Sequence, residues 1–202
     1  MQTPHIEILS LWSNSLLEQW LADHAPHTER LAHIAQTQAA DSIFATDDAS
    51  VDWLKANIIH GIGAMLNNET FDAAPDIEVN ARIDIYSTER YSSLVNRPGA
   101  YLSGLYVLLA PRGEPTLGER ADNCPGCVTF YDPRVGMNMN AIRLDPYVNY
   151  HYTVEFVPGL LLIWPSYMSY YVHPHLAASP AVHVGFDVHA SRPHTPNGGH
   201  ET

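Results

Sequence analysis

The stretch IEVNARIDIY, residues 77–86, alternates apolar and polar residues one by one. Successive side chains of a strand point to opposite faces, so this alternation predicts a strand with one face buried. The residues of the predicted buried face are Ile77, Val79, Ala81, Ile83 and Ile85. The chain is therefore expected to form sheet from this point onward.

The chain before this stretch shows the spacing of helices instead. Apolar residues recur at three- and four-residue intervals from Ser15 to Leu21 and from Glu29 to Ile34, and Pro26 is expected to break the two pieces apart. A third helix is predicted from Ser50 to Leu66, with Ser50 as its cap.

Short strand-like runs follow the alternating stretch, separated by turns rich in Pro, Gly and Asn. They are Tyr101–Leu109, Cys127–Tyr131, Tyr152–Phe156, Leu160–Trp164 and Ala181–Val188. Helices followed by at least six short strands predict a mainly β protein, an antiparallel double-stranded β-helix (a cupin-like jelly roll) braced by N-terminal helices. We expect one domain over residues 1–188, helical over 10–68 and sheet over 76–188, with a flexible tail over 189–202.

The composition excludes several classes of function. Of the 202 residues, 46% are hydrophobic and 16% charged, which supports a packed core. Ten Lys+Arg against 22 Asp+Glu give a net charge of −12, which repels phosphate backbones and anionic membranes. No apolar run approaches the roughly 18 residues that span a bilayer, and the first residues lack the pattern of a signal peptide. We expect a cytoplasmic protein whose partner is a small-molecule substrate, with no nucleic acid and no membrane, and homodimer formation is left open.

Three strings in the sheet half carry a family likeness: RPGAYLSGLYVLL (Arg97–Leu109), GCVTFYDPR (Gly126–Arg134) and PGLLLIWPSYMSYYVHP (Pro158–Pro174). With the following AVHVGFDV (Ala181–Val188), their order resembles a bacterial and phage family of 2-oxoglutarate/Fe(II)-dependent oxygenases. That family has H-x-H-P-G before L-S-G-x-Y-Y, then G-x-L-x-F-x-D-P-R, G-x-L-x-x-F-P-S-x-L-x-H-x-V-x-P and R-I-S-I-S-F-N. The likeness runs from about residue 8 to residue 188, and it implies the jelly-roll fold.

The positions that hold the family's cofactors carry different residues here. The resemblance places Val95 and Arg97 at the first two histidines, Tyr170 at the distal histidine and Ala181 at the arginine that clamps 2-oxoglutarate. Valine has no lone pair, arginine is permanently cationic, and tyrosine binds iron only as a phenolate. The resemblance thus implies a kept fold that has lost its usual iron and 2-oxoglutarate ligands, so no cofactor is expected. The alternative is an active Fe(II)/2-oxoglutarate hydroxylase with substituted ligands, drawn from His173, His175, His183, Asp187 or Tyr170.

Alternation along Ala181–Val188 places His183 and Asp187 on the face of the former cofactor cavity, with Val182, Val184 and Phe186 on the other face. His183 fits a general acid/base or a ligand, and it equally fits a buried histidine bonded to backbone or to Asp187. The candidate catalytic residues are His183, Tyr170 and Arg97, and the candidate substrate-binding residues are Tyr91, Tyr171 and Asp187. We therefore expect a small molecule to bind in the barrel mouth and to be transformed by acid/base catalysis of the isomerase or cyclase type. A non-catalytic partner protein is the other alternative.

Two histidines of the H-P-H segment, His173 and His175, could form a Zn, Cu or Fe site with His183 or His151, although ordinary packing is favoured among twelve histidines. The C-x-x-C of Cys124–Cys127 is interpreted as a tight turn, because no helix follows it as thioredoxin-like chemistry requires and two thiols make half a zinc site.

The D-P-R of Asp132–Arg134 matches the family's D-P-R string. It is expected to form a buried ion pair that fixes a turn, rather than to act in catalysis.

Overall fold

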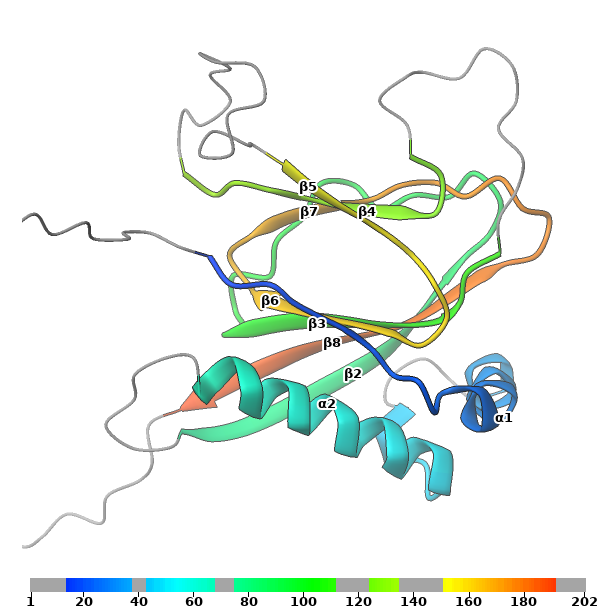
Figure 1. The fold of residues 1–202 in the computed structure, drawn as a ribbon, viewed down its shortest axis with the longest axis horizontal. Coiled ribbons are helices and arrows are strands. Elements are labelled where there is room, and N and C mark those ends of the chain that lie inside the picture. Colours follow the sequence, from blue (N-terminus) through cyan, green and yellow to red (C-terminus); the bar gives the residue numbers. More distant parts are fainter. Residues whose placement is uncertain (1–13, 38–42, 68–74, 112–123, 135–150, 192–202) are drawn as a thin grey trace, which may run out of the picture.

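The computed structural model describes residues 14–37, 43–67, 75–111, 124–134 and 151–191, and in them two antiparallel sheets face each other (Figure 1). The large sheet has the order β1 (Leu17–Trp20), β6 (Leu160–Pro165), β3 (Leu102–Leu109), β8 (Ala181–Ser191) and β2 (Asp76–Tyr86). The small sheet has the order β5 (His151–Glu155), β4 (Cys127–Tyr131) and β7 (Ser169–Val172). This arrangement confirms the predicted mainly β jelly roll.

The alternating stretch is strand β2, which pairs with β8 along its whole length, from Asp76 opposite Ser191 to Tyr86 opposite Ala181. Ala81 and Ile83 are buried as predicted. Ile77 and Ile85, near the two ends of the strand, are exposed, so the predicted buried face holds only in its middle.

Helices cover the outer face of the large sheet, namely α1 (Ala25–Thr37), the short 3₁₀ helix η1 (Ile43–Ala45) and α2 (Ala49–Asn67) (Figure 1). The core beneath them includes the stripe Val51, Leu54, Ile58 and Ile62 of α2 and the residues Val182, Val184 and Phe186 of β8, as predicted. In the described part of the chain, no helix combines the length and apolar character needed to cross a membrane.

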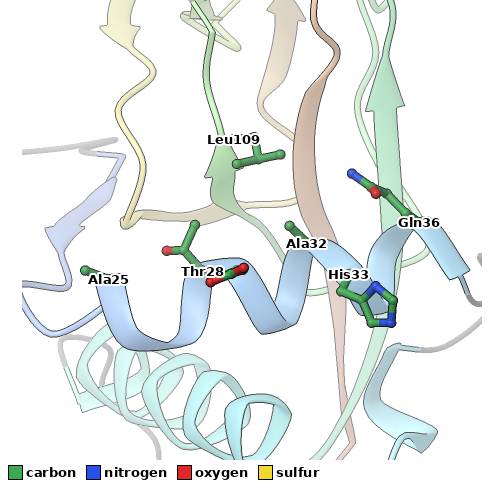
Figure 2. Close-up of a pocket in the computed structure, with 7 residues that line it drawn as sticks. Ala25, Thr28, Ala32, His33, Gln36 and Leu109 are labelled. Atoms are coloured by element: carbon green, nitrogen blue, oxygen red, sulfur yellow. The ribbon is translucent and has the colours of Figure 1, made fainter.

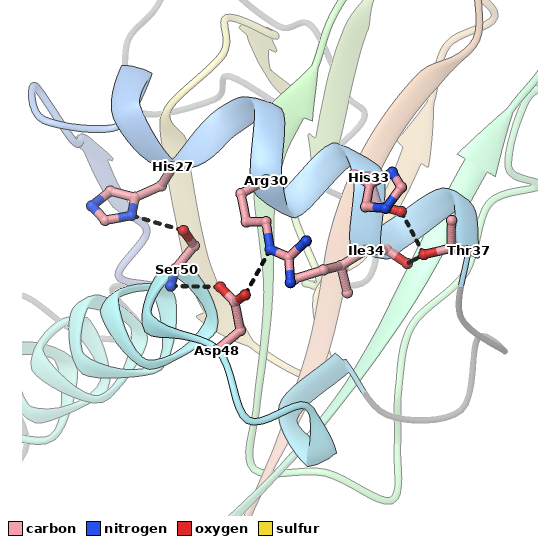
Figure 3. Close-up of polar contacts among 7 residues, drawn as sticks. All are labelled: His27, Arg30, His33, Ile34, Thr37, Asp48 and Ser50. Atoms are coloured by element: carbon pink, nitrogen blue, oxygen red, sulfur yellow. Dashed lines mark hydrogen bonds and ion pairs between the residues drawn. The ribbon is translucent and has the colours of Figure 1, made fainter.

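The start of α2 is capped by Asp48 (Figure 3). The Ser50 N–H donates to Asp48 Oδ1 at 2.9 Å, and the Asp52 N–H donates to the Asp48 carbonyl at 3.0 Å. Arg30 of α1 bonds the same carboxylate, with its Nε 2.7 Å from Asp48 Oδ2. The Ser50 hydroxyl instead forms a hydrogen bond with His27 Nδ1 at 3.1 Å. The predicted cap was therefore wrong by two residues, because the carboxylate before the helix reaches the free N–H groups.

Three predictions about the ends of the domain were wrong. The segment predicted as helix over Ser15–Leu21 contains strand β1, whose Leu17 lies opposite Ile163. Helical spacing over seven residues cannot outweigh pairing with the edge of β6. Pro26 lies in the first turn of α1 instead of breaking a helix, because that position needs no N–H donor. Residues 189–191 belong to β8 instead of the tail, and 192–202 lie outside the described residues.

A second core fills the space between the two sheets. The large sheet contributes Leu105, Val107, Leu160, Leu162 and Trp164, and the small sheet contributes Val128, Phe130, Val154, Tyr170 and Val172. The side chains of the candidate site lie at the borders of this core, so both sheets position them.

Candidate functional site

Three positions that the family likeness identified as former cofactor ligands meet in space. Val95 and Tyr170 form an antiparallel bridge, in which each N–H donates to the other's carbonyl at 3.0 and 2.9 Å. The Tyr170 side chain is buried and hydrogen-bonds the Arg97 guanidinium, while the Arg97 N–H donates to the Ser166 carbonyl at 2.9 Å. Residues about 75 positions apart are thus brought together, as the register of the motifs predicted.

The charge of Arg97 is stabilised by its surroundings. Burial works against the charged form, but Tyr170, Asp187 and Asp84 together more than offset it, so the pKa of Arg97 is raised above its ordinary value. Arg97 therefore places a fixed positive charge where the family likeness put a metal ligand.

Strand β2 adds polar side chains that the sequence analysis did not include in the site. Arg82 bridges two carboxylates, with Nη1 3.0 Å from Asp187 Oδ2 and Nε 3.4 Å from Asp84 Oδ1. The Ser103 hydroxyl donates to the other oxygen of Asp187 at 2.8 Å. Tyr86 follows on the same face of β2 and interacts electrostatically with Tyr170 and Arg97. The even-numbered residues of the alternating stretch were the available signal, because they face the same side as the odd-numbered residues of β8.

Gly185 makes room for this ion-pair cluster. A Cβ at Gly185 would lie 2.6 Å from Asp84 Oδ2 and 3.0 Å from Arg82 Nη2, closer than carbon atoms tolerate. The absence of a side chain on β8 therefore allows Arg82 and Asp84 to lie across the strand.

Asp84 is the group in this cluster best placed to exchange a proton. Burial raises the pKa of its carboxyl above the ordinary value, a rise that Asp187 supports and that Arg82 and Arg97 only partly oppose. Its side chain is still 27% exposed, so a molecule at the barrel mouth can reach it. A partly exposed carboxyl with a raised pKa among charged neighbours is a typical acid/base candidate.

His183 points into the space between the sheets, as alternation predicted. It is not the buried histidine bonded to backbone or to Asp187 that was the other interpretation. Its ring packs against Phe156 at 4.4 Å and Tyr86 at 5.3 Å between centroids, and neither ring nitrogen has a partner in the described residues. Asp187 is unavailable because it bonds Arg82 and Ser103. Burial, and to a lesser extent His175, lowers the pKa of His183 to about 3, so the ring is neutral at physiological pH.

Tyr171 and Tyr91 were expected in the barrel interior, and the structure places them outside it. Tyr170 and Val172 belong to the core between the sheets, so Tyr171 between them points to the opposite face of β7. The Tyr171 ring lies 6.0 Å from the exposed Tyr91 ring and 4.7 Å from His173. Two consecutive strand residues cannot share one face, which was evident from the sequence alone.

The histidines proposed as a metal site do not converge. His173 accepts from the Cys124 N–H at Nδ1 (3.3 Å), so its Nε2 donates to the Thr129 hydroxyl (2.8 Å). His175 Nε2 donates to the Tyr86 carbonyl at 2.8 Å, and His151 begins β5 beside Tyr131. Within the ranges that the structure describes, no three His, Cys, Asp or Glu side chains gather in a way that could hold a metal ion.

Cys124–Cys127 forms the predicted turn and also a disulfide, which was not predicted. The Cys127 N–H donates to the Cys124 carbonyl at 3.0 Å, and Gly126 has the positive φ of 73° that such a turn uses.

Asp132 and Arg134 form the expected ion pair after β4. The Arg134 side chain is 40% exposed, so the pair is not buried as predicted.

A separate groove of about 530 Å³ lies along α1 (Figure 2). It is lined by Ala25, Thr28, Glu29, Ala32, His33, Gln36 and Leu109. None of these residues belongs to the barrel cluster, and no predicted site residue lines the groove.

Comparison with known proteins agrees with this geometry at the level of the fold. No family model matches the chain, and no curated protein matches its sequence. A prolyl-4-hydroxylase from Pseudomonas putida is similar over 91% of this chain and 90% of its own, with a TM-score of 0.60 and 14% identity. The non-heme α-ketoglutarate-dependent epimerase SnoN from nogalamycin biosynthesis covers 87% and 77% of the two chains (TM-score 0.56, 10% identity). HygX from Streptomyces hygroscopicus with iron bound covers 87% and 82% (TM-score 0.55, 8% identity).

The chain therefore has the fold of the 2-oxoglutarate/Fe(II) oxygenases, at sequence identities of 8–14% to the solved structures. The likeness inferred from its motifs is confirmed for that fold.

Proposed function

We propose that this chain is an oxygenase-fold protein that does not hold iron and 2-oxoglutarate at the usual positions and instead binds a small molecule at the barrel mouth. We further propose that it transfers protons to or from that molecule. Asp84 takes the acid/base role that the sequence analysis assigned to His183, and Arg97 and Tyr170 bind the molecule's polar groups.

The single observation that carries the proposal is the contact between Tyr170 and its two partners. Val95 bridges the Tyr170 backbone, and the Tyr170 side chain bonds a guanidinium. A facial iron site needs imidazole and carboxylate donors with open positions. Aliphatic carbon, a cation and a phenol bonded to that cation do not fit such a metal, so no step of the reaction is routed through iron.

His183 does not fit the catalytic role because its pKa is lowered to about 3. An imidazole with so low a pKa is a weak base and a poor proton carrier at neutral pH. Asp84 is partly exposed, and burial raises the pKa of its carboxyl above the ordinary value.

One of the neighbouring structures is described as an epimerase. That epimerase is α-ketoglutarate-dependent, so it supports the proposal only in that the same fold serves an epimerisation. The reaction class remains part of the proposal.

The test is an anaerobic titration of the full chain with Fe(II) and 2-oxoglutarate, followed by visible spectroscopy. We expect no metal-to-ligand charge-transfer band. A band that saturates at one equivalent would contradict the loss of the cofactor site.

A second arm screens small polar molecules for thermal protection. A molecule that protects the wild type should fail to protect Arg97→Gln, and Asp84→Asn should abolish turnover while protection persists. Arg134→Gln is the matched control, because that guanidinium pairs with Asp132 outside the barrel. If no molecule protects and a protein partner is recovered instead, the chain is a binding partner and the proposal is wrong.

A further inference from the structure

Two buried N–H donors beside Tyr170 lack an acceptor among the described residues. One is Nε of Arg97 and the other is Nε1 of Trp164. Trp164 is 1% exposed, and its ring lies 5.0 Å from the Tyr170 ring at an interplanar angle of 66°. Since Tyr170 also bonds Arg97, both donors border the same side chain.

Unpaired donors in this position point to an acceptor-bearing ligand. Buried polar groups in folded proteins are nearly always hydrogen-bonded, and each exception calls for an explanation. Neighbouring acceptors do not resolve it here, because Asp187 is engaged by Arg82 and Ser103. Tyr170 has only one hydroxyl to offer, and it already contacts the guanidinium.

The charges favour an anionic acceptor over a neutral one. Arg82 has two carboxylates within ion-pair distance, Asp84 and Asp187. In the described residues, no carboxylate lies within that distance of Arg97. A guanidinium whose N–H groups lack a carboxylate partner is well suited to hydrogen-bond a carboxylate, often in a bidentate manner.

We infer that the molecule bound in the barrel mouth is a small monocarboxylic acid, whose carboxylate oxygens accept from Arg97 Nε and Trp164 Nε1. This inference rests on the proposed function and specifies its ligand class. A single negative charge is required, because Asp84 and Asp187 act electrostatically on Arg97 and would repel a doubly charged phosphate from the same place.

The experiment is a ¹H–¹⁵N NMR titration that follows the Arg97 Nε–H and Trp164 indole N–H resonances of the full chain. The Trp164 resonance is assigned by its loss in Trp164→Phe, since the chain has four tryptophans. The probes are acetate, butyrate and benzoate, each with its amide and its amine, and inorganic phosphate. We expect a carboxylate to move both resonances. Its amide should bind at least about tenfold more weakly, because it loses a charge-assisted hydrogen bond.

Two variants sharpen the result. Arg97→Gln should weaken carboxylate binding about tenfold or more, and Arg134→Gln should leave it unchanged. Because the titration uses the wild-type chain first, a variant that fails to fold does not remove the test.

The outcomes separate the ligand class from the function. If amides or amines move the Trp164 resonance as well as the acids do, or if phosphate binds in their place, the carboxylate assignment is wrong and the barrel still binds a small molecule. If Arg97→Gln binds the acids unchanged, the carboxylate lies elsewhere and the assignment is wrong. If no probe moves either resonance, the carboxylate assignment is wrong, and the thermal-protection screen decides separately whether the barrel binds a small molecule.

Discussion

Replacing His183 by leucine should change how the stability of the protein depends on pH. The folded chain holds this imidazole neutral, with a pKa of about 3, whereas the unfolded chain titrates it at the ordinary 6.5. Well above pH 6.5 the His183 imidazole is neutral in both the folded and the unfolded state, so it adds almost no pH dependence to the free energy of unfolding. As the pH falls below 6.5, the unfolded chain takes up a proton that the folded chain refuses, and the native state loses stability.

The magnitude follows from the two pKa values. At pH 5, protonation of this imidazole raises the statistical weight of the unfolded state by a factor of about 32 and that of the folded state by a factor of about 1. The ratio corresponds to a loss of about 2 kcal/mol in the free energy of unfolding. At pH 7 the same term is only about 0.2 kcal/mol. Wild-type stability should therefore fall between pH 7 and pH 5 by about 2 kcal/mol more than that of His183→Leu.

The assay is urea unfolding at pH 7 and pH 5, followed by tryptophan fluorescence, for both proteins. The difference of the two pH effects isolates His183, because the acidic residues and other histidines contribute equally to both proteins. His60→Leu, on the exposed side of α2, is the control and should retain the wild-type pH dependence. Equal pH dependence in wild type and His183→Leu would refute the description of His183 as buried and unpaired.

Three further substitutions test the barrel and its site. Gly104→Ala should destabilise the chain by about 3 kcal/mol in urea unfolding, because the new Cβ would lie 2.0 Å from Cζ of buried Phe186; a loss below about 1 kcal/mol would show that β3 and β8 pack differently. Gly185→Ala meets only the movable ends of Arg82 and Asp84, so the fold should persist while the pKa of Asp84, measured by carboxyl ¹³C NMR, changes from its wild-type value; an unchanged pKa would mean that Gly185 does not position this pair. Thr129→Val removes the acceptor of His173 Nε2 and should cost about 1–2 kcal/mol in urea unfolding, whereas exposed Thr153→Val should cost less than about 0.5 kcal/mol; equal losses would show that the buried bond between Thr129 and His173 does not stabilise the fold more than the exposed one.

The sheet could be predicted from the sequence because strand alternation is a local property. The pattern of residues 77–86 set the inner and outer faces of β2, and that of Ala181–Val188 placed His183 between the sheets. Strand β1 could not be predicted this way, because its partner β6 lies at least 140 residues further along the chain. Only four residues of β1 pair, too few to show a period.

The candidate site was predictable in part. The register of the motifs brought Arg97 and Tyr170 together correctly, although neither residue signals a site by itself. The partners of Asp187 were not predictable, because Arg82 lies 105 residues away on another strand. Once Arg82 and Ser103 occupy Asp187, His183 is left without its expected partner. The proposed transfer of the acid/base role from His183 to Asp84 starts from this long-range ion pair.

The direct test of the account is an anomalous-diffraction experiment on crystals soaked without oxygen in Mn(II), as a substitute for Fe(II), and 2-oxoglutarate. We expect no anomalous peak beside Tyr170, with its hydrogen bond to Arg97 intact. An ordered manganese ion with the keto acid beside it, at the place where Arg97 meets Tyr170, would contradict the account.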